Sequence, residues 1–159
     1  MRMTSGSHSA VERDSSALFL TPAGREALTA RIRQLEALVE TLLARQAEGN
    51  AEDLTGVEYQ RASDEIVRLR AALKAARPVE DLPADPRTVV LGDTVAVSLL
   101  EGGTDCYVIV DALEAHFDDR RISSDCPLGR ALLGRRVGEV VEVDAPGGRY
   151  RCLIESAYR

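Results

Sequence analysis

The stretch AEGNAEDLTGVEY, residues 47–59, separates two long segments whose apolar residues follow a helical pattern. It carries Glu48, Glu52, Asp53 and Glu58 and contains no Lys or Arg. If the two flanking helices pair in antiparallel fashion, this stretch is the turn at the far end of the pair. We therefore expect a rod whose tip presents negative charge, an arrangement that the stability of a soluble domain does not require.

The segment before this turn predicts an amphipathic helix that starts at Thr21 and Pro22. A Thr at the N-cap followed by Pro at the first helical position is a common helix start. Gly49 and Asn50 predict its end, because both residues readily adopt the left-handed C-cap conformation. The apolar residues between these ends recur at alternating steps of four and three, which is the heptad spacing of a coiled coil. They are Leu28, Ile32, Leu35, Val39 and Leu42, with Leu38 and Leu43 expected to widen the seam.

The segment after the turn repeats this spacing and predicts a second helix. It begins between Asp53 and Val57 and is stopped by Pro78. Because the two seams match in period and length, we expect an antiparallel coiled-coil hairpin over residues 18–77. The alternative is two helices of a closed bundle, but the sequence has no further long helical pattern to complete one. The second seam consists of Tyr59, Ala62, Ile66, Leu69, Leu73 and Ala76.

The pattern changes after residue 77. Residues 78–87 contain three prolines and predict an extended, semi-rigid linker. Residues 88–159 contain short alternating apolar segments bounded by Gly and Pro, with one short helical segment near residues 127–133, and they predict a small domain of mainly antiparallel strands. The predicted fold class is therefore α+β, with a helical hairpin followed by a β domain that carries one short helix.

Composition and charge restrict the environment and the function. The net charge is −6 and the pI is near 5.0, which argues against free binding to nucleic acid but not against a partner that itself binds nucleic acid. No apolar run reaches the roughly 20 residues of a membrane span. Residues 1–17 lack the apolar region of a signal peptide and are expected to form a disordered tail. We expect a cytoplasmic protein that does not associate with membranes.

The cysteines and histidines do not have the spacing of a zinc site. Cys106, Cys126 and Cys152 are far apart, no Cys-x-x-Cys pair is present, and His8 and His116 are widely separated. We expect the three cysteines to be reduced residues that contribute to packing.

Three parts of the chain carry a recognisable pattern: LTPAG (20–24), DLT with EY (53–55 and 58–59), and ISSDCPLGRALLG (122–134) continued by GEVVEV (138–143) and APGG (145–148). Together they resemble the Gre family of bacterial transcript-cleavage factors. The third part is the most specific, and it resembles the C-terminal domain of these factors, which has an FKBP-like fold. The resemblance covers about residues 19–159 in the order found in the family.

The resemblance implies a regulator of RNA polymerase. In this family the C-terminal domain docks at the rim of the polymerase secondary channel, and the coiled coil enters the channel. Its tip carboxylates help to hold the second catalytic magnesium ion and to position the water that hydrolyses backtracked RNA. The chain would then be no enzyme by itself, would have no cofactor of its own beyond a magnesium ion shared with the polymerase, would contact nascent RNA and DNA only indirectly, and is expected to be a monomer.

The tip departs from the family pattern. Asp53 matches the Asp of the family tip and is the candidate ligand of the shared magnesium. The family places a Leu, one further residue and a Glu after this Asp, whereas here Gly56 follows Thr55. Glu52 and Glu58 remain as candidates for the second acid. Because of this change, and because the second helix is shorter than is usual in the family, we expect weak or absent stimulation of cleavage in a divergent member.

The resemblance also identifies residues that would face the polymerase on the second domain. They are Asp125, Cys126, Pro127 and Arg130. The structural alternative for residues 125–127 is simply a helix start with Pro at its first position, and the alternative for Arg130 is a solvated surface arginine.

Other functions stay open at this point. A working cleavage factor would use Asp53 with Glu52 or Glu58. An FKBP-like peptidyl-prolyl isomerase is a candidate from another class, but it needs an aromatic pocket, and the second domain has no Trp and only four aromatic residues. The acidic turn could also be only a solvated surface. The four aromatic residues are Tyr107, Phe117, Tyr150 and Tyr158.

Overall fold

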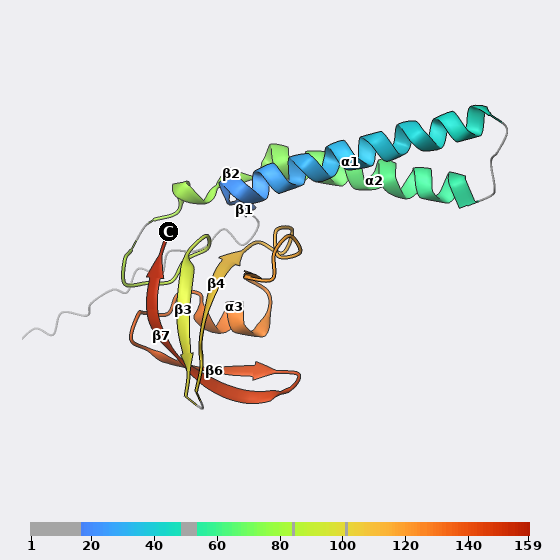
Figure 1. Cartoon of the computed structure of the whole chain (residues 1–159). Coiled ribbons are helices and arrows are strands. Elements are labelled where there is room, and N and C mark those ends of the chain that lie inside the picture. The colour runs from blue at the N-terminus through green and yellow to red at the C-terminus, as the bar shows by residue number, and fades with distance from the viewer. Residues whose placement is uncertain (1–16, 49–53, 84, 101) are drawn as a thin grey trace, which may run out of the picture.

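The computed structural model describes residues 17–48, 54–83, 85–100 and 102–159, which form a long helical hairpin and a β domain (Figure 1). The hairpin consists of α1 (Pro22–Ala47) and α2 (Leu54–Ala75). The two helices project away from the β domain, and the ends at Ala47 and Leu54 lie farthest from it (Figure 1). With 26 residues, α1 is about 39 Å long. The antiparallel hairpin predicted from the matching heptads is confirmed.

One apolar seam joins the helices. Thr21 caps α1 as predicted, because its side-chain oxygen accepts a hydrogen bond from the backbone N–H of Gly24 at 2.9 Å. The central seam positions predicted in both helices are buried, and Val39, Leu73 and Ala76 pack against them with partial exposure. The buried seam residues are Leu28, Ile32, Leu35 and Leu42 of α1 and Ala62, Ile66 and Leu69 of α2.

Three apolar residues toward the tip do not follow the prediction. Leu38 and Leu43, expected to widen the seam, are 42% and 47% exposed, and Tyr59, expected within the seam, is 37% exposed. Two paired helices cover only one narrow strip of each other, so apolar residues beside that strip stay in solvent when no third element packs on them.

The base of the hairpin is closed by backbone pairing and by one arginine. A two-residue parallel ladder joins β1 (Phe19–Leu20) to β2 (Arg77–Pro78). From α1, Arg25 donates hydrogen bonds to the carbonyl oxygens of Leu73 at 3.2 Å and Ala76 at 3.0 Å. A guanidinium at these carbonyls satisfies acceptors that the end of α2 leaves open and complements the helix dipole.

The β domain is a five-stranded sheet with the order β5-β4-β3-β7-β6. All neighbouring strands are antiparallel except β4 and β5, which are parallel. The short helix α3 (Pro127–Leu132) packs beside the sheet, and its Leu132 is fully buried in the core. The predicted α+β class, with a mainly antiparallel β domain and one short helix, is confirmed. The strands are β3 (Thr94–Leu99), β4 (Thr104–Val110), β5 (Arg121–Ser123), β6 (Val140–Ala145) and β7 (Gly148–Tyr158).

The segment that connects the hairpin to the β domain, residues 76–93, is more structured than the extended linker predicted for residues 78–87. Its first half contains a single 3-10 turn, η1 (Val79–Asp81), and Val79 is only 2% exposed. Val79 packs beneath the turn at Gly92, where an added Cβ would lie 3.0 Å from the Val79 side chain. Burial of one apolar residue therefore anchors a segment for which the prolines predicted only extension.

Within the described ranges, no helix is both long enough and apolar enough to cross a membrane.

Candidate functional site

The tip of the hairpin carries two described acidic side chains. Glu48 is the C-cap residue of α1, and Glu58 lies in α2 one turn after its start. Both residues are exposed. Glu52 and Asp53 lie outside the described residues, so the prediction that Asp53 helps to hold a shared magnesium stays a prediction.

The described carboxylates do not form a metal site of their own. No cluster of three or more His, Cys, Asp or Glu residues that could hold a metal ion occurs in the described part of the chain. Magnesium commonly takes only one or two carboxylates from a protein and completes its shell with water and phosphate oxygens. The exposed carboxylates at the tip fit this use as additional ligands for an ion that another molecule holds.

The four residues predicted to face a partner lie together on one turn of the β domain. Asp125 and Arg130 are exposed, and Cys126 and Pro127 are half-buried. Cys126 is the N-cap of α3, and its sulfur accepts a hydrogen bond from the backbone N–H of Gly129 at 3.2 Å. An added Cβ at Gly129 would lie 2.1 Å from the carbonyl oxygen of Ser123, so only glycine allows α3 to approach β5 this closely. The segment is thus a helix start, as the structural alternative proposed, and it also presents polar side chains outward.

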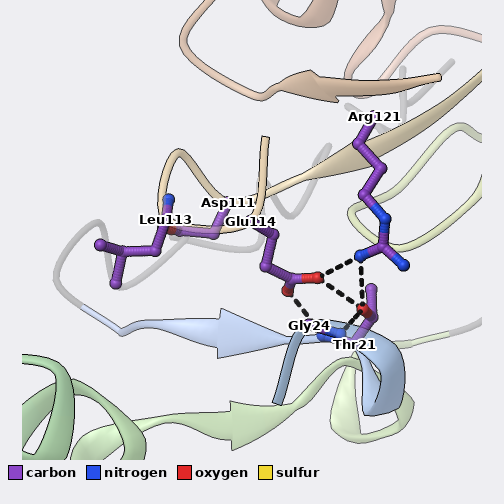
Figure 2. A network of polar contacts seen from close by, with 6 residues as sticks. All are labelled: Thr21, Gly24, Asp111, Leu113, Glu114 and Arg121. Atoms are coloured by element: carbon purple, nitrogen blue, oxygen red, sulfur yellow. Dashed lines mark hydrogen bonds and ion pairs between the residues drawn. The ribbon is translucent and has the colours of Figure 1, made fainter. Parts of the chain in front are cut away.

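A third polar site lies between the hairpin and the β domain (Figure 2). Glu114, in the loop between β4 and β5, is fully buried. Its Oε1 accepts a hydrogen bond from the backbone N–H of Thr21 at 2.7 Å, and its Oε2 accepts one from the Thr21 hydroxyl. The Arg121 guanidinium donates to the same Oε2 at 2.9 Å. The carboxylate therefore joins the N-cap of α1 to the start of β5.

Sequence reasoning missed this third site. Glu114 is one of several acidic residues in a polar loop, and 93 residues separate it from Thr21. A weak signal was present in Gly24, because a glycine in the first turn of a helix suggests that another group comes close. An added Cβ at Gly24 would lie 1.9 Å from the carboxyl group of Glu114.

The four aromatic residues of the β domain differ in their burial. Tyr107 and Tyr150 pack against the core, whereas Phe117 is 40% and Tyr158 is 59% exposed. Burial raises the pKa of both core tyrosines, and the nearby Asp105 contributes to the rise in the pKa of Tyr107.

Together, the fold and these sites define a protein of two parts, a helical rod with the exposed acids Glu48 and Glu58 near its far end and a β domain with an exposed polar turn. Residues 84–159 match the family model described as "Transcription elongation factor, GreA/GreB, C-term". A transcription elongation factor GreA of Bacillus cytotoxicus is 31% identical over 150 residues, which cover 86% of this chain and 94% of the relative. The chain therefore belongs to the GreA/GreB family of transcription elongation factors.

Another relative matches over a smaller part of the chain, and a solved structure is less similar in sequence. A GreA of Thermotoga petrophila is 39% identical over 98 residues, which cover 61% of this chain and 62% of the relative. Among solved structures, the GreA factor homolog 1 (Gfh1) of Thermus thermophilus is 26% identical, with a TM-score of 0.42 over 90% of this chain and 99% of that one.

Proposed function

We propose that this chain binds RNA polymerase, with its β domain at the rim of the secondary channel and its hairpin inside the channel. The observation that carries the proposal is the hairpin itself: in a member of the GreA/GreB family, two paired helices of 26 and 22 residues project away from the β domain, which they touch at their base (Figure 1). An exposed acidic tip suits a channel that leads to a catalytic magnesium ion. The turn of Asp125, Cys126, Pro127 and Arg130 is the proposed docking surface.

We further propose that the chain occupies the channel with weak or no stimulation of transcript cleavage. Gly56 stands where the family pattern places the second tip acid, so Asp53 has no partner at that position. Glu58 lies two residues further along α2, which rotates its side chain by about 200° around the helix relative to position 56. A factor of this kind regulates elongation or initiation by occupying the channel, where it competes with other channel-binding factors.

The position of Gly56 allows a direct test by restoring the missing acid. An added Cβ at Gly56 meets no atom within 4 Å, so a longer side chain fits there without displacing its surroundings. We expect Gly56→Glu to increase the rate of dinucleotide release from backtracked polymerase complexes by about tenfold or more, because two carboxylates then act on one metal. Gly56→Gln, which has the same shape without the charge, is the matched control and should leave the rate unchanged.

A working cleavage factor is the second candidate function, favoured by the exposed acid Glu58 in the first turns of α2. Asp53→Ala decides between the two. Efficient release by the wild-type chain that is lost in Asp53→Ala would establish the cleavage factor and contradict the proposal of weak cleavage. Failure of the wild-type chain to co-purify with core RNA polymerase would contradict both.

A further inference from the structure

The hairpin is joined to the β domain by one covalent connection, residues 76–93, which could act as a pivot. Two separate sets of contacts oppose rotation about it. The first is the buried Glu114 at the start of α1, and the second is Arg159 beside the segment that leaves α2. We propose that Glu114 is a positioning residue that, with Arg159 on the other side, fixes the direction in which the hairpin projects and so places the tip; its role in placing the tip rests on the proposed function.

Glu114 has the properties of a fixed attachment. The carboxylate is fully buried, Thr21 is 8% exposed, and the Arg121 side chain is 17% exposed. Burial of an ionised carboxylate is costly unless it is paired and hydrogen-bonded, and three donors from two parts of the molecule meet this one. The N-terminal end of a helix also attracts negative charge. Separation of the hairpin from the β domain would remove both Thr21 donors and leave the buried carboxylate paired with Arg121 alone, which opposes the separation.

The second attachment holds the other side of the hairpin base. The Arg159 guanidinium donates a hydrogen bond to the carbonyl oxygen of Val79 at 2.9 Å and forms an ion pair with Asp93 at 3.4 Å. Asp93, which is 5% exposed, also accepts a hydrogen bond from the backbone N–H of Val90 at 2.9 Å. Val79 itself is buried against the Gly92 turn. A hairpin attached only at Glu114 could rotate about that contact. The second attachment at Arg159 opposes this rotation.

The length of the hairpin makes this restraint important for the tip. A rotation of about 10° at the base moves the end of a helix of about 39 Å by about 7 Å. Displacements of even about 1 Å can greatly reduce the rate of a reaction that depends on positioned groups. Glu114 lies at the base and would act on the tip only through Thr21 and α1.

The test changes the Glu114 carboxylate without changing its size. In Glu114→Gln, one oxygen becomes an NH₂ group, which must face either the Thr21 N–H or the Arg121 guanidinium, both of which are donors. Residual dipolar couplings of backbone amides then report orientation directly in the full-length chain. In the wild type, the amides of α1 and α2 and those of the β domain should fit one alignment tensor. In Glu114→Gln, the couplings of the hairpin should still fit one tensor, and so should those of the β domain. The two tensors should differ.

Matched variants separate positioning from general damage. Glu65→Gln removes a half-buried carboxylate that pairs with Arg31 on the hairpin surface at 3.0 Å, and it should keep the single tensor. Thr21→Ala removes the hydroxyl that donates to Glu114, and the hairpin and the β domain should then require different tensors. Thr21→Ser supplies a hydroxyl again and should restore the single tensor.

The two proposals can fail separately in this design. A single tensor with wild-type orientation in both Glu114→Gln and Thr21→Ala would overturn the role of Glu114, whatever the chain does with polymerase. Split tensors in these variants, found together with a wild-type chain that does not bind polymerase, would support the role of Glu114 in orientation and overturn the proposed function.

Discussion

At the scale of single residues, Gly24 is a position where the structure leaves no room for a side chain. An added Cβ would overlap the Glu114 carboxyl group, which cannot move aside without breaking its hydrogen bonds to Thr21 and Arg121. We expect Gly24→Ala to lower the free energy of unfolding by about 1–3 kcal/mol, as overpacking does in other buried sites. Urea unfolding followed by circular dichroism measures this change.

Gly56 supplies the control for this prediction, because it is also a helical glycine but has open space around it. Gly56→Ala should raise the stability by up to about 1 kcal/mol through helix propensity alone. A Gly24→Ala variant as stable as the wild type would contradict the close contact between Gly24 and Glu114.

The cysteines give a second prediction at this scale. Cys106 is exposed, Cys126 is half-buried and Cys152 is buried. Burial raises the pKa of the Cys152 thiol, so a smaller fraction of it is ionised at any mildly alkaline pH, and the thiolate is the reactive form. We expect iodoacetamide at pH 8.5 to modify Cys106 first and Cys152 last, as followed by peptide mass spectrometry. Modification of Cys152 in the folded chain as fast as that of Cys106 would contradict the packing of β7.

Single residues were predictable from the sequence where their role is local. The Thr21 cap followed from the neighbouring Pro22, and the helix start at Pro127 followed in the same way, since both depend on residues within one turn. Glu114 was not predictable, because Thr21, the partner that ties it to the hairpin, is 93 positions away and nothing in its neighbours distinguishes it from a solvated acid.

At the scale of elements, the hairpin depends on its one seam. Ile66 and Val67 are neighbours in α2, but Ile66 is 8% exposed and Val67 is 67% exposed. We expect Ile66→Ala to destabilise the hairpin by about 2–5 kcal/mol, because it leaves a cavity between the helices. Val67→Ala should change the stability by no more than about 0.5 kcal/mol.

Thermal unfolding at 222 nm, where the helices dominate the signal, measures both variants. Equal melting temperatures for Ile66→Ala and Val67→Ala would contradict the assignment of the seam and therefore the orientation of α2 against α1.

The elements differ in how far the sequence predicted them. Both long helices were found because their heptads repeat over many residues, and each repeat adds to the same signal. The strand β5 was missed because it has only three residues and pairs in parallel with β4, a relation that no local pattern encodes. The turn η1 was missed because its stability comes from burial of Val79, whereas the prolines around it indicate only an extended chain.

At the scale of the whole molecule, the arrangement of the two parts is the feature that sequence patterns could not provide. It depends on contacts between residues 93 positions apart at Glu114 and Thr21, and 80 positions apart at Arg159 and Val79. These contacts turn a hairpin and a β domain into one object with a defined direction. The proposed function requires that direction, because the β domain would dock outside the channel and the tip would act inside it.

The most direct test of the whole account locates the tip within the bound complex. Iron(II) can replace magnesium in the catalytic centre of core RNA polymerase and generate hydroxyl radicals that cleave only nearby protein backbone. We expect the bound chain to be cut between residues 48 and 58 and residues 85–159 to stay intact. Cleavage confined to the β domain, or a bound chain with no cleavage near the tip, would contradict the claim that the hairpin brings its acidic end to the catalytic metal.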